Sequence, residues 1–175
     1  IIVKSRSHPV GWPVYSATLG TGSYLRLDLT NSTLSSTSVW DNTTPTASVF
    51  SVGANGDSNG LSRTYVAYLF ATCAGVSKVG SYTGTGTTLQ INCGFTAGAR
   101  FVLIKRTDST GDWYVWDSAR GIVAGNDPHL SLNSTAAEVT TDDSVDTDST
   151  GFIVNQLSAT NVNVTSATYI GLAIA

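Results

Sequence analysis

Hydrophobic residues in this chain either alternate with polar residues or form short unbroken runs, and no segment repeats them with helical spacing. Residues 24–29 (YLRLDL) alternate, as in a strand with one buried face. Residues 101–104 (FVLI) and 65–70 (YVAYLF) are continuous apolar runs, which favour central strands covered on both faces. Glycine and asparagine mark turns between such segments, for example at 20–22 and 55–56. The pattern predicts an all-β protein of about 12–14 strands.

Five blocks of sequence occur twice, in the same order. The matching pairs are 1–4 with 102–105, 11–16 with 112–117, 24–27 with 129–132, 50–52 with 152–154, and 64–71 with 168–175. Chance alternation of strand-forming residues would not keep both order and spacing, so the repetition indicates a duplication. The sequence therefore predicts a single domain, 1–175, built from two duplicated halves, 1–72 and 101–175.

The segment between the halves has apolar residues alternating on both sides of a threonine- and glycine-rich turn at 83–88. This arrangement predicts a hairpin over 73–100 that joins the halves. Two stacked antiparallel sheets accommodate the expected number of strands. The predicted fold is thus an antiparallel, jelly-roll-like β-sandwich.

Serine and threonine provide 47 of the 175 residues, whereas charged residues make up 12%, against about 25% in an average globular protein. This composition favours an extracellular or virion protein. The net charge of −3 argues against nucleic-acid binding, and no apolar run reaches the ~18 residues of a membrane span. The chain starts at Ile1, lacks methionine and shows no signal peptide, so we expect a processed product or part of a longer protein.

Two cysteines, Cys73 and Cys93, allow a disulfide that would stabilise the fold by about 3 kcal/mol in the chain-entropy model. The alternative is a pair of buried thiols on neighbouring strands. A zinc site is not expected, because His8 and His129 lie at no recognisable ligand spacing from the cysteines.

Aromatic residues recur in the duplicated blocks. Trp12 and Trp113 occupy the same position in both halves, which favours a core role. Tyr15 and Trp116 also match each other, and their face is undecided. These two are the candidate surface-binding aromatics, since sugar-binding sandwiches often present such rings.

The acidic stretch 142–151 resembles the start of a calcium loop, but Leu157 stands where the bidentate acid would be needed. We therefore expect a solvated loop, and we predict no metal ligand and no cofactor. Catalysis is not expected either, because Glu138 is the single glutamate and neither histidine lies in a nucleophile motif.

Basic residues follow the first predicted strand of each half, and we expect them to protect an exposed sheet edge or to contact an acidic surface. They are Lys4, Arg6, Lys105 and Arg106. Four glycosylation sequons also occur, at Asn31, Asn42, Asn133 and Asn163, and their use depends on the host.

Several segments, among them GWPVY, TASVFSVG, CGFTAGARFVLIKRTDSTGDWYVWDSARG and ATYIGLAIA, carry a resemblance to a known family. They resemble a domain of unknown function in virion proteins of marine and freshwater bacteriophages, usually part of a tail fibre or another structural protein. The resemblance covers nearly the whole chain and is most specific over 78–121. It implies a structural or adsorption role and transfers no catalytic residue.

The expected function is accordingly that of a virion module, in a tail fibre or comparable appendage, with host adsorption as its task. The expected partners are other virion subunits, in a homo-oligomer such as a trimer, and a glycan on the host surface. Alternatives are a capsid decoration or head-fibre protein, a carbohydrate-binding module, and a filament subunit in which an edge strand of one copy completes the next.

Overall fold

The computed structural model describes residues 1–175, which form thirteen strands and one helix of four residues. Contacts group the residues into two compact units, Ile1–Leu69 and Phe70–Ala175. All strand pairs are antiparallel, so the prediction of an all-β fold with antiparallel sheets is confirmed. The one helix, of four residues, is too short to span a membrane. The single domain and the jelly-roll order stay predictions.

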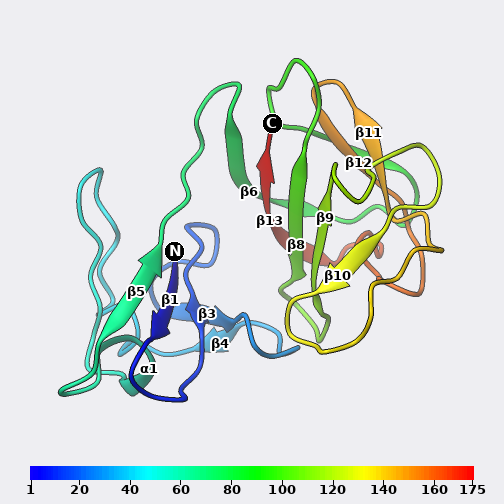
Figure 1. Ribbon diagram of the computed structural model, residues 1–175. Helices are drawn as coiled ribbons and strands as arrows, with labels where there is room; N and C mark the ends of the chain where they lie inside the picture. Colours follow the sequence, from blue (N-terminus) through cyan, green and yellow to red (C-terminus); the bar gives the residue numbers. More distant parts are fainter. The chain divides into compact units, whose positions relative to one another are not determined.

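The first unit contains one five-stranded sheet in the order β4-β3-β2-β1-β5 (Figure 1). Its elements are β1 (Ile2–Ser5), β2 (Pro13–Val14), β3 (Ser23–Arg26), β4 (Leu34–Ser35), α1 (Gly56–Asn59) and β5 (Tyr65–Tyr68). Asn55 caps α1 by accepting a hydrogen bond from the backbone N–H of Asp57. The buried centre of this unit is formed by Val3, Val39 and Trp40.

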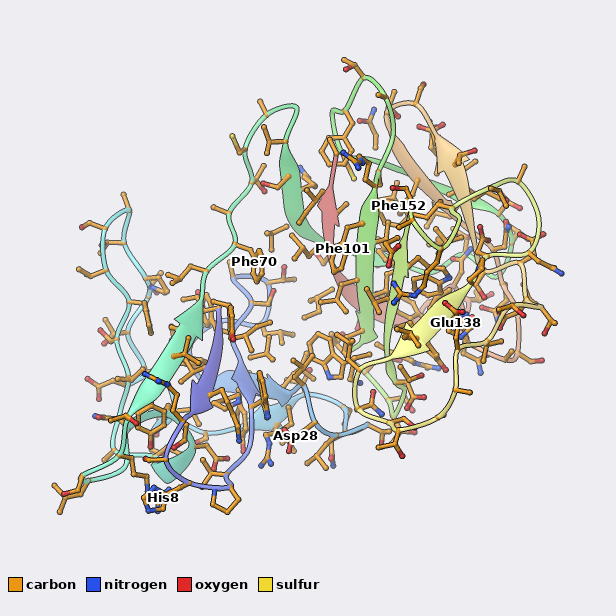
Figure 2. The ribbon with its side chains drawn as sticks, viewed as in Figure 1. His8, Asp28, Phe70, Phe101, Glu138 and Phe152 are labelled. Atoms are coloured by element: carbon orange, nitrogen blue, oxygen red, sulfur yellow. The ribbon has the colours of Figure 1, made fainter.

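The second unit contains a five-stranded sheet, β10-β9-β8-β13-β6, and a three-stranded sheet, β11-β12-β7 (Figure 1). The strands are β6 (Ser77–Thr83), β7 (Leu89–Asn92), β8 (Phe101–Arg106), β9 (Trp113–Asp117), β10 (His129–Ser131), β11 (Val145–Asp148), β12 (Gly151–Val154) and β13 (Thr168–Ile174). Both sheets contribute to one hydrophobic core: Val102, Trp116 and Tyr169 come from the larger sheet, and Phe152 and Val154 from the smaller. Phe152 is labelled in Figure 2. The second unit is therefore built as two sheets sharing one apolar interior.

The predicted hairpin over 73–100 is wrong in its pairing. The segment does contain two strands, β6 and β7, on either side of a turn. However, β6 pairs with β13 and β7 pairs with β12. Each strand covers its apolar positions by joining a different sheet. The free energy gained from this apolar burial outweighs the ease with which two strands joined by a short turn would pair with each other.

Strand positions within the sheets also differ in part from the prediction. The run 101–104 lies in β8, which is central between β9 and β13, as expected. The run 65–70 instead provides β5, which lies at an edge. Lys4 and Lys105 do not protect an edge, because β1 and β8 each have a neighbour on both sides.

The two five-stranded sheets repeat the same pairing, since β3-β2-β1-β5 has its counterpart in β10-β9-β8-β13. The matching registers are Ile2↔Val14 with Leu103↔Val115, Val14↔Leu25 with Val115↔Leu130, and Val3↔Ala67 with Ile104↔Gly171. Side-chain contacts recur as well: the backbone N–H of Trp12 donates to Asp28 Oδ1 (3.0 Å), and the backbone N–H of Trp113 donates to Asn133 Oδ1 (2.7 Å). One difference remains. Strand β6 covers the outer edge of β13, whereas β5 has no second neighbour.

Candidate functional site

The two candidate surface aromatics do not form a binding platform. Trp116 is fully buried (0% exposed), with its ring centroid 5.4 Å from that of His129. The prediction for Trp116 is wrong because this face of β9 forms the core of the second unit. Tyr15 is half-buried, and its ring meets the buried ring of Trp40 edge-on at 5.7 Å. Trp40 has no partner in the repeated blocks, so no sequence signal drew attention to it.

The two tryptophans assigned to the core have different surroundings. Trp113 is 2% exposed, as predicted. Trp12 is half-buried, and Lys4 Nζ lies 5.3 Å above the centroid of its ring. The ammonium group also donates a hydrogen bond to Val10 O (2.6 Å). Lys4 therefore stabilises its own unit through an aromatic face and a carbonyl group.

A buried histidine–aspartate pair lies beside the core of the second unit. His129 Nδ1 is 3.1 Å from Asp142 Oδ1, and both side chains are buried. The rings of Tyr114 and Trp116 flank the imidazole, at centroid distances of 5.2 and 5.4 Å. The backbones of His129 and Val139 exchange two hydrogen bonds. The pair thus holds the segment before β11 against β10.

Three further carboxylates gather next to this pair: Asp127, Asp143 and Asp146, with ligand atoms within 4.8 Å of one another. Asp127 is completely buried, and its two oxygens accept hydrogen bonds from the N–H groups of Val123 (3.0 Å) and Val145 (3.1 Å). Burial raises the pKa of Asp127 to about 6, and the charges of Asp146 and Asp143 act in the same direction. The two backbone donors oppose the shift.

Carboxylate oxygens are the ligands that Ca²⁺ and Mg²⁺ prefer, so this acidic group comprises the residues that could hold a hard cation. Protein donors already contact it, however. Asn155 Nδ2 donates to Asp143 Oδ1 (3.1 Å) and to Asp146 Oδ2 (2.8 Å), and the Gly125 N–H donates to Asp146 Oδ1 (3.1 Å). We therefore assign the acidic group a structural role, in which it ties the loop before β10 to β11.

The acidic stretch 142–151 is not the solvated loop expected from the sequence. Most of it forms the hairpin of β11 and β12, in which Asp148 pairs with Gly151. Asp148 Oδ1 accepts hydrogen bonds from the N–H (2.8 Å) and the hydroxyl (2.6 Å) of Thr150. These hydrogen bonds stabilise the turn between β11 and β12, so Asp148 has a structural role in the hairpin.

The two cysteines are both free. Cys73 is exposed, whereas Cys93 is buried, and burial raises the pKa of the Cys93 thiol. Cys93 lines a cavity of about 90 Å³ together with Lys78, Tyr82 and Phe152. The disulfide that the spacing allows is not formed in this structure.

The four sequons differ in access. Asn31 and Asn42 are exposed. The side chain of Asn133 is hydrogen-bonded within the protein: its Nδ2 donates to Asp112 Oδ1 (2.9 Å), and its Oδ1 accepts from the backbone N–H of Trp113. Asn163 is completely buried; its Nδ2 donates to Val154 O (3.1 Å) and its Oδ1 accepts from the Thr85 N–H (2.8 Å). Only the first two sequons are therefore exposed in the folded chain, and Asn42 Oδ1 accepts a hydrogen bond from the Thr21 hydroxyl (3.1 Å).

These features define an all-β protein in which buried polar groups and caps hold loops to antiparallel sheets. The chain belongs to a family described as a domain of unknown function, DUF7483, whose family model matches residues 1–175. Comparisons with curated proteins and with solved structures give no match.

Proposed function

We propose that this protein is a structural module of a bacteriophage virion, in a tail fibre or comparable appendage, which helps to build the particle and to adsorb it to the host surface. The role is adhesive and structural, without a catalytic step. The bacteriophage origin rests on the sequence resemblance described above. The partners are other virion subunits and a host surface glycan.

The observation that carries this proposal is the repetition of one sheet, with the same order and registers, in two compact units. This repetition supports a duplication as the origin of the two units. Repeated β modules suit an elongated appendage, because each copy adds length and a further contact surface. Weak contacts then add up through avidity.

The exposed surface supplies the groups for such contacts. In the loop over residues 41–49 (DNTTPTASV), every residue except Pro45 is exposed, and five of the nine are serine or threonine or carry an amide. Hydroxyl and amide groups both donate and accept hydrogen bonds, as sugar hydroxyls do. Because Trp116 is buried, adhesion in this proposal depends on polar groups rather than on a stacked aromatic ring.

The proposal is tested by locating the protein in native particles. An antibody raised against the purified chain, visualised with gold by electron microscopy, should label the tail appendages. Labelling spread over the head would replace the proposal with a capsid decoration protein, and absence from the particle would overturn it. Hydrolysis of a polysaccharide by the purified protein would contradict the non-catalytic role.

A further inference from the structure

Strand β5 is an edge strand without the usual protection. Natural edges are kept from pairing by short length, charged residues or proline. Here β4 and β10 have two and three residues, β6 and β11 carry charged side chains, and β7 exposes Gln90 and Asn92. Strand β5 and the residue after it read Tyr-Val-Ala-Tyr-Leu, without charge or proline. Its sequence is that of a central strand, yet it has one neighbour.

The side chains at the end of β5 confirm the contrast with the second unit. Tyr68 is 46% exposed and Leu69 is 61% exposed. In the repeated blocks their counterparts are Leu172 and Ala173, which are 8% and 2% exposed. Those residues belong to β13, whose outer edge is covered by β6. The same sequence block is therefore covered in one unit and open in the other.

The backbone of β5 is oriented for a further antiparallel neighbour. Thr64 O accepts from the Arg6 N–H (2.8 Å), so the backbone groups of Thr64 face β1. Because these directions alternate along a strand, the N–H and C=O groups of Tyr65, Ala67 and Leu69 face the open edge. The second unit shows the same arrangement: Thr168 O accepts from the N–H of Thr107, the residue that follows β8 (2.9 Å).

We propose that β5 pairs with β5 of a second copy of this chain, antiparallel about a two-fold axis, with Ala67 opposite Ala67. This register joins the outward-facing backbone groups of both copies. It places Tyr65 opposite Leu69 and Val66 opposite Tyr68, so every pair is apolar and no like charges meet. Aromatic and β-branched residues form favourable cross-strand pairs. The strand is thus complementary to itself, as a two-fold interface requires.

The inference stands on the strand pairing alone and is independent of the virion role. Analytical ultracentrifugation of the full chain should show a monomer–dimer equilibrium. Leu69→Lys should weaken dimerisation by about tenfold or more, because a symmetric interface receives the charge twice. Leu61→Lys is the matched control: Leu61 is 95% exposed but lies outside any strand, so its dimer should be unchanged.

A second variant keeps the sheet of the unit intact. Ala67→Pro removes an N–H that faces the open edge and none that faces β1, and proline is tolerated at such positions. The variant should be monomeric, with the circular dichroism spectrum of the wild type. A monomeric wild type, a trimer, or equal effects of Leu69→Lys and Leu61→Lys would overturn the proposal.

The register is tested by cross-linking in a Cys73→Ser background. A mixture of Val66→Cys and Tyr68→Cys chains should form an intermolecular disulfide under mild oxidation, because these positions lie directly opposite each other in the proposed pair. Val66→Cys alone should cross-link far less, because the two substituted positions, one in each copy, are diagonal neighbours in this register rather than directly opposite. Equal cross-linking in both samples would contradict the register.

Discussion

Lys105 provides the sharpest test of the packing in the second unit. The side chain is completely buried in β8 (0% exposed), and its Nζ donates a hydrogen bond to Arg106 O (2.8 Å). Burial lowers the pKa of Lys105 to about 8, against the attraction of Asp112, which acts in the opposite direction. Replacing Lys105 with methionine keeps an unbranched side chain of similar length and removes the titrating group.

The sign of the effect follows from proton binding. The unfolded chain holds the Lys105 proton with the ordinary pKa of 10.5, so the folded protein binds it more weakly. Between about pH 8 and pH 10.5, unfolding therefore takes up a proton, and the free energy of unfolding rises with pH. The difference between the two pKa values corresponds to roughly 3 kcal/mol. This cost of the charged lysine is fully present below pH 8 and is relieved above pH 10.5.

The measurement is urea unfolding of wild type and Lys105→Met, followed by tryptophan fluorescence at several pH values. Other groups titrate in both proteins and cancel in the comparison. The stability of the variant relative to the wild type should fall by roughly 3 kcal/mol between pH 7 and pH 10.5. Lys4→Met is the control, because Lys4 is the counterpart of Lys105 in the repeat and loses the same charge from a half-buried position.

One result would refute the reasoning. If the relative stability of Lys105→Met stays constant from pH 7 to pH 10.5, the ammonium group of Lys105 is not desolvated in the fold. The hydrogen bond to Arg106 lost in the variant does not change the sign of this test, because any weakening of that bond when the ammonium loses its proton is already contained in the folded-state pKa of Lys105.

Three further predictions follow from burial. Trp116→Ala should lower the free energy of unfolding by about 3–5 kcal/mol. Trp116→Phe should lower it by less, because the buried indole N–H has no hydrogen-bond partner to lose. Unchanged stability of Trp116→Ala with lost glycan binding would contradict this. Expressed in a glycosylating host, the chain should carry sugar at Asn42 and none at Asn163, as peptide mass spectrometry would show; sugar on Asn163 would contradict its burial. A thiol reagent should modify Cys73 in the folded protein and Cys93 after unfolding, and equal rates would be inconsistent with the structure.

The strands of this protein were accessible from sequence because they are encoded locally. The run over 101–104 lies in β8, and the alternation over residues 24–29 lies in β3 as far as Arg26, after which the chain turns. The repeated blocks went further, because blocks at matching positions form strands with matching registers. Local pattern and internal repetition together therefore predict which segments are strands and which of them are counterparts.

Sequence could not assign the side of a sheet that becomes buried. Trp116 and Lys105 lie on β9 and β8 and are both fully buried, although one is large and apolar and the other is charged. Alternation tells which residues share a face, but the cover over that face comes from segments far away in the chain. The burial of Trp116 depends on β11 and β12, whose approach no local pattern shows.

The acidic group illustrates the same limit. Asp143 and Asp146 are close in sequence, whereas Asp127 comes from a different loop. The three side chains meet because β11 runs beside that loop: the buried carboxylate of Asp127 accepts hydrogen bonds from the backbone N–H of Val145 in β11 and from that of Val123 in its own loop. Such a meeting depends on tertiary structure, so neither spacing nor composition could reveal it.

The two units also separate what the repeated sequence determines from what the surroundings determine. The hydroxyl of Tyr65 donates to Gly56 O (2.7 Å) and accepts from the Gly60 N–H, and the hydroxyl of Tyr169 donates to Asn161 O (2.7 Å) and accepts from the Val164 N–H. These turn-holding bonds are the same because both partners lie inside the repeat. The outer edge differs, because β6 comes from outside the repeat and covers only one copy. Differences in function between the units are therefore to be sought at the edges of the sheets, where an added strand changes the surface and leaves the repeated fold intact.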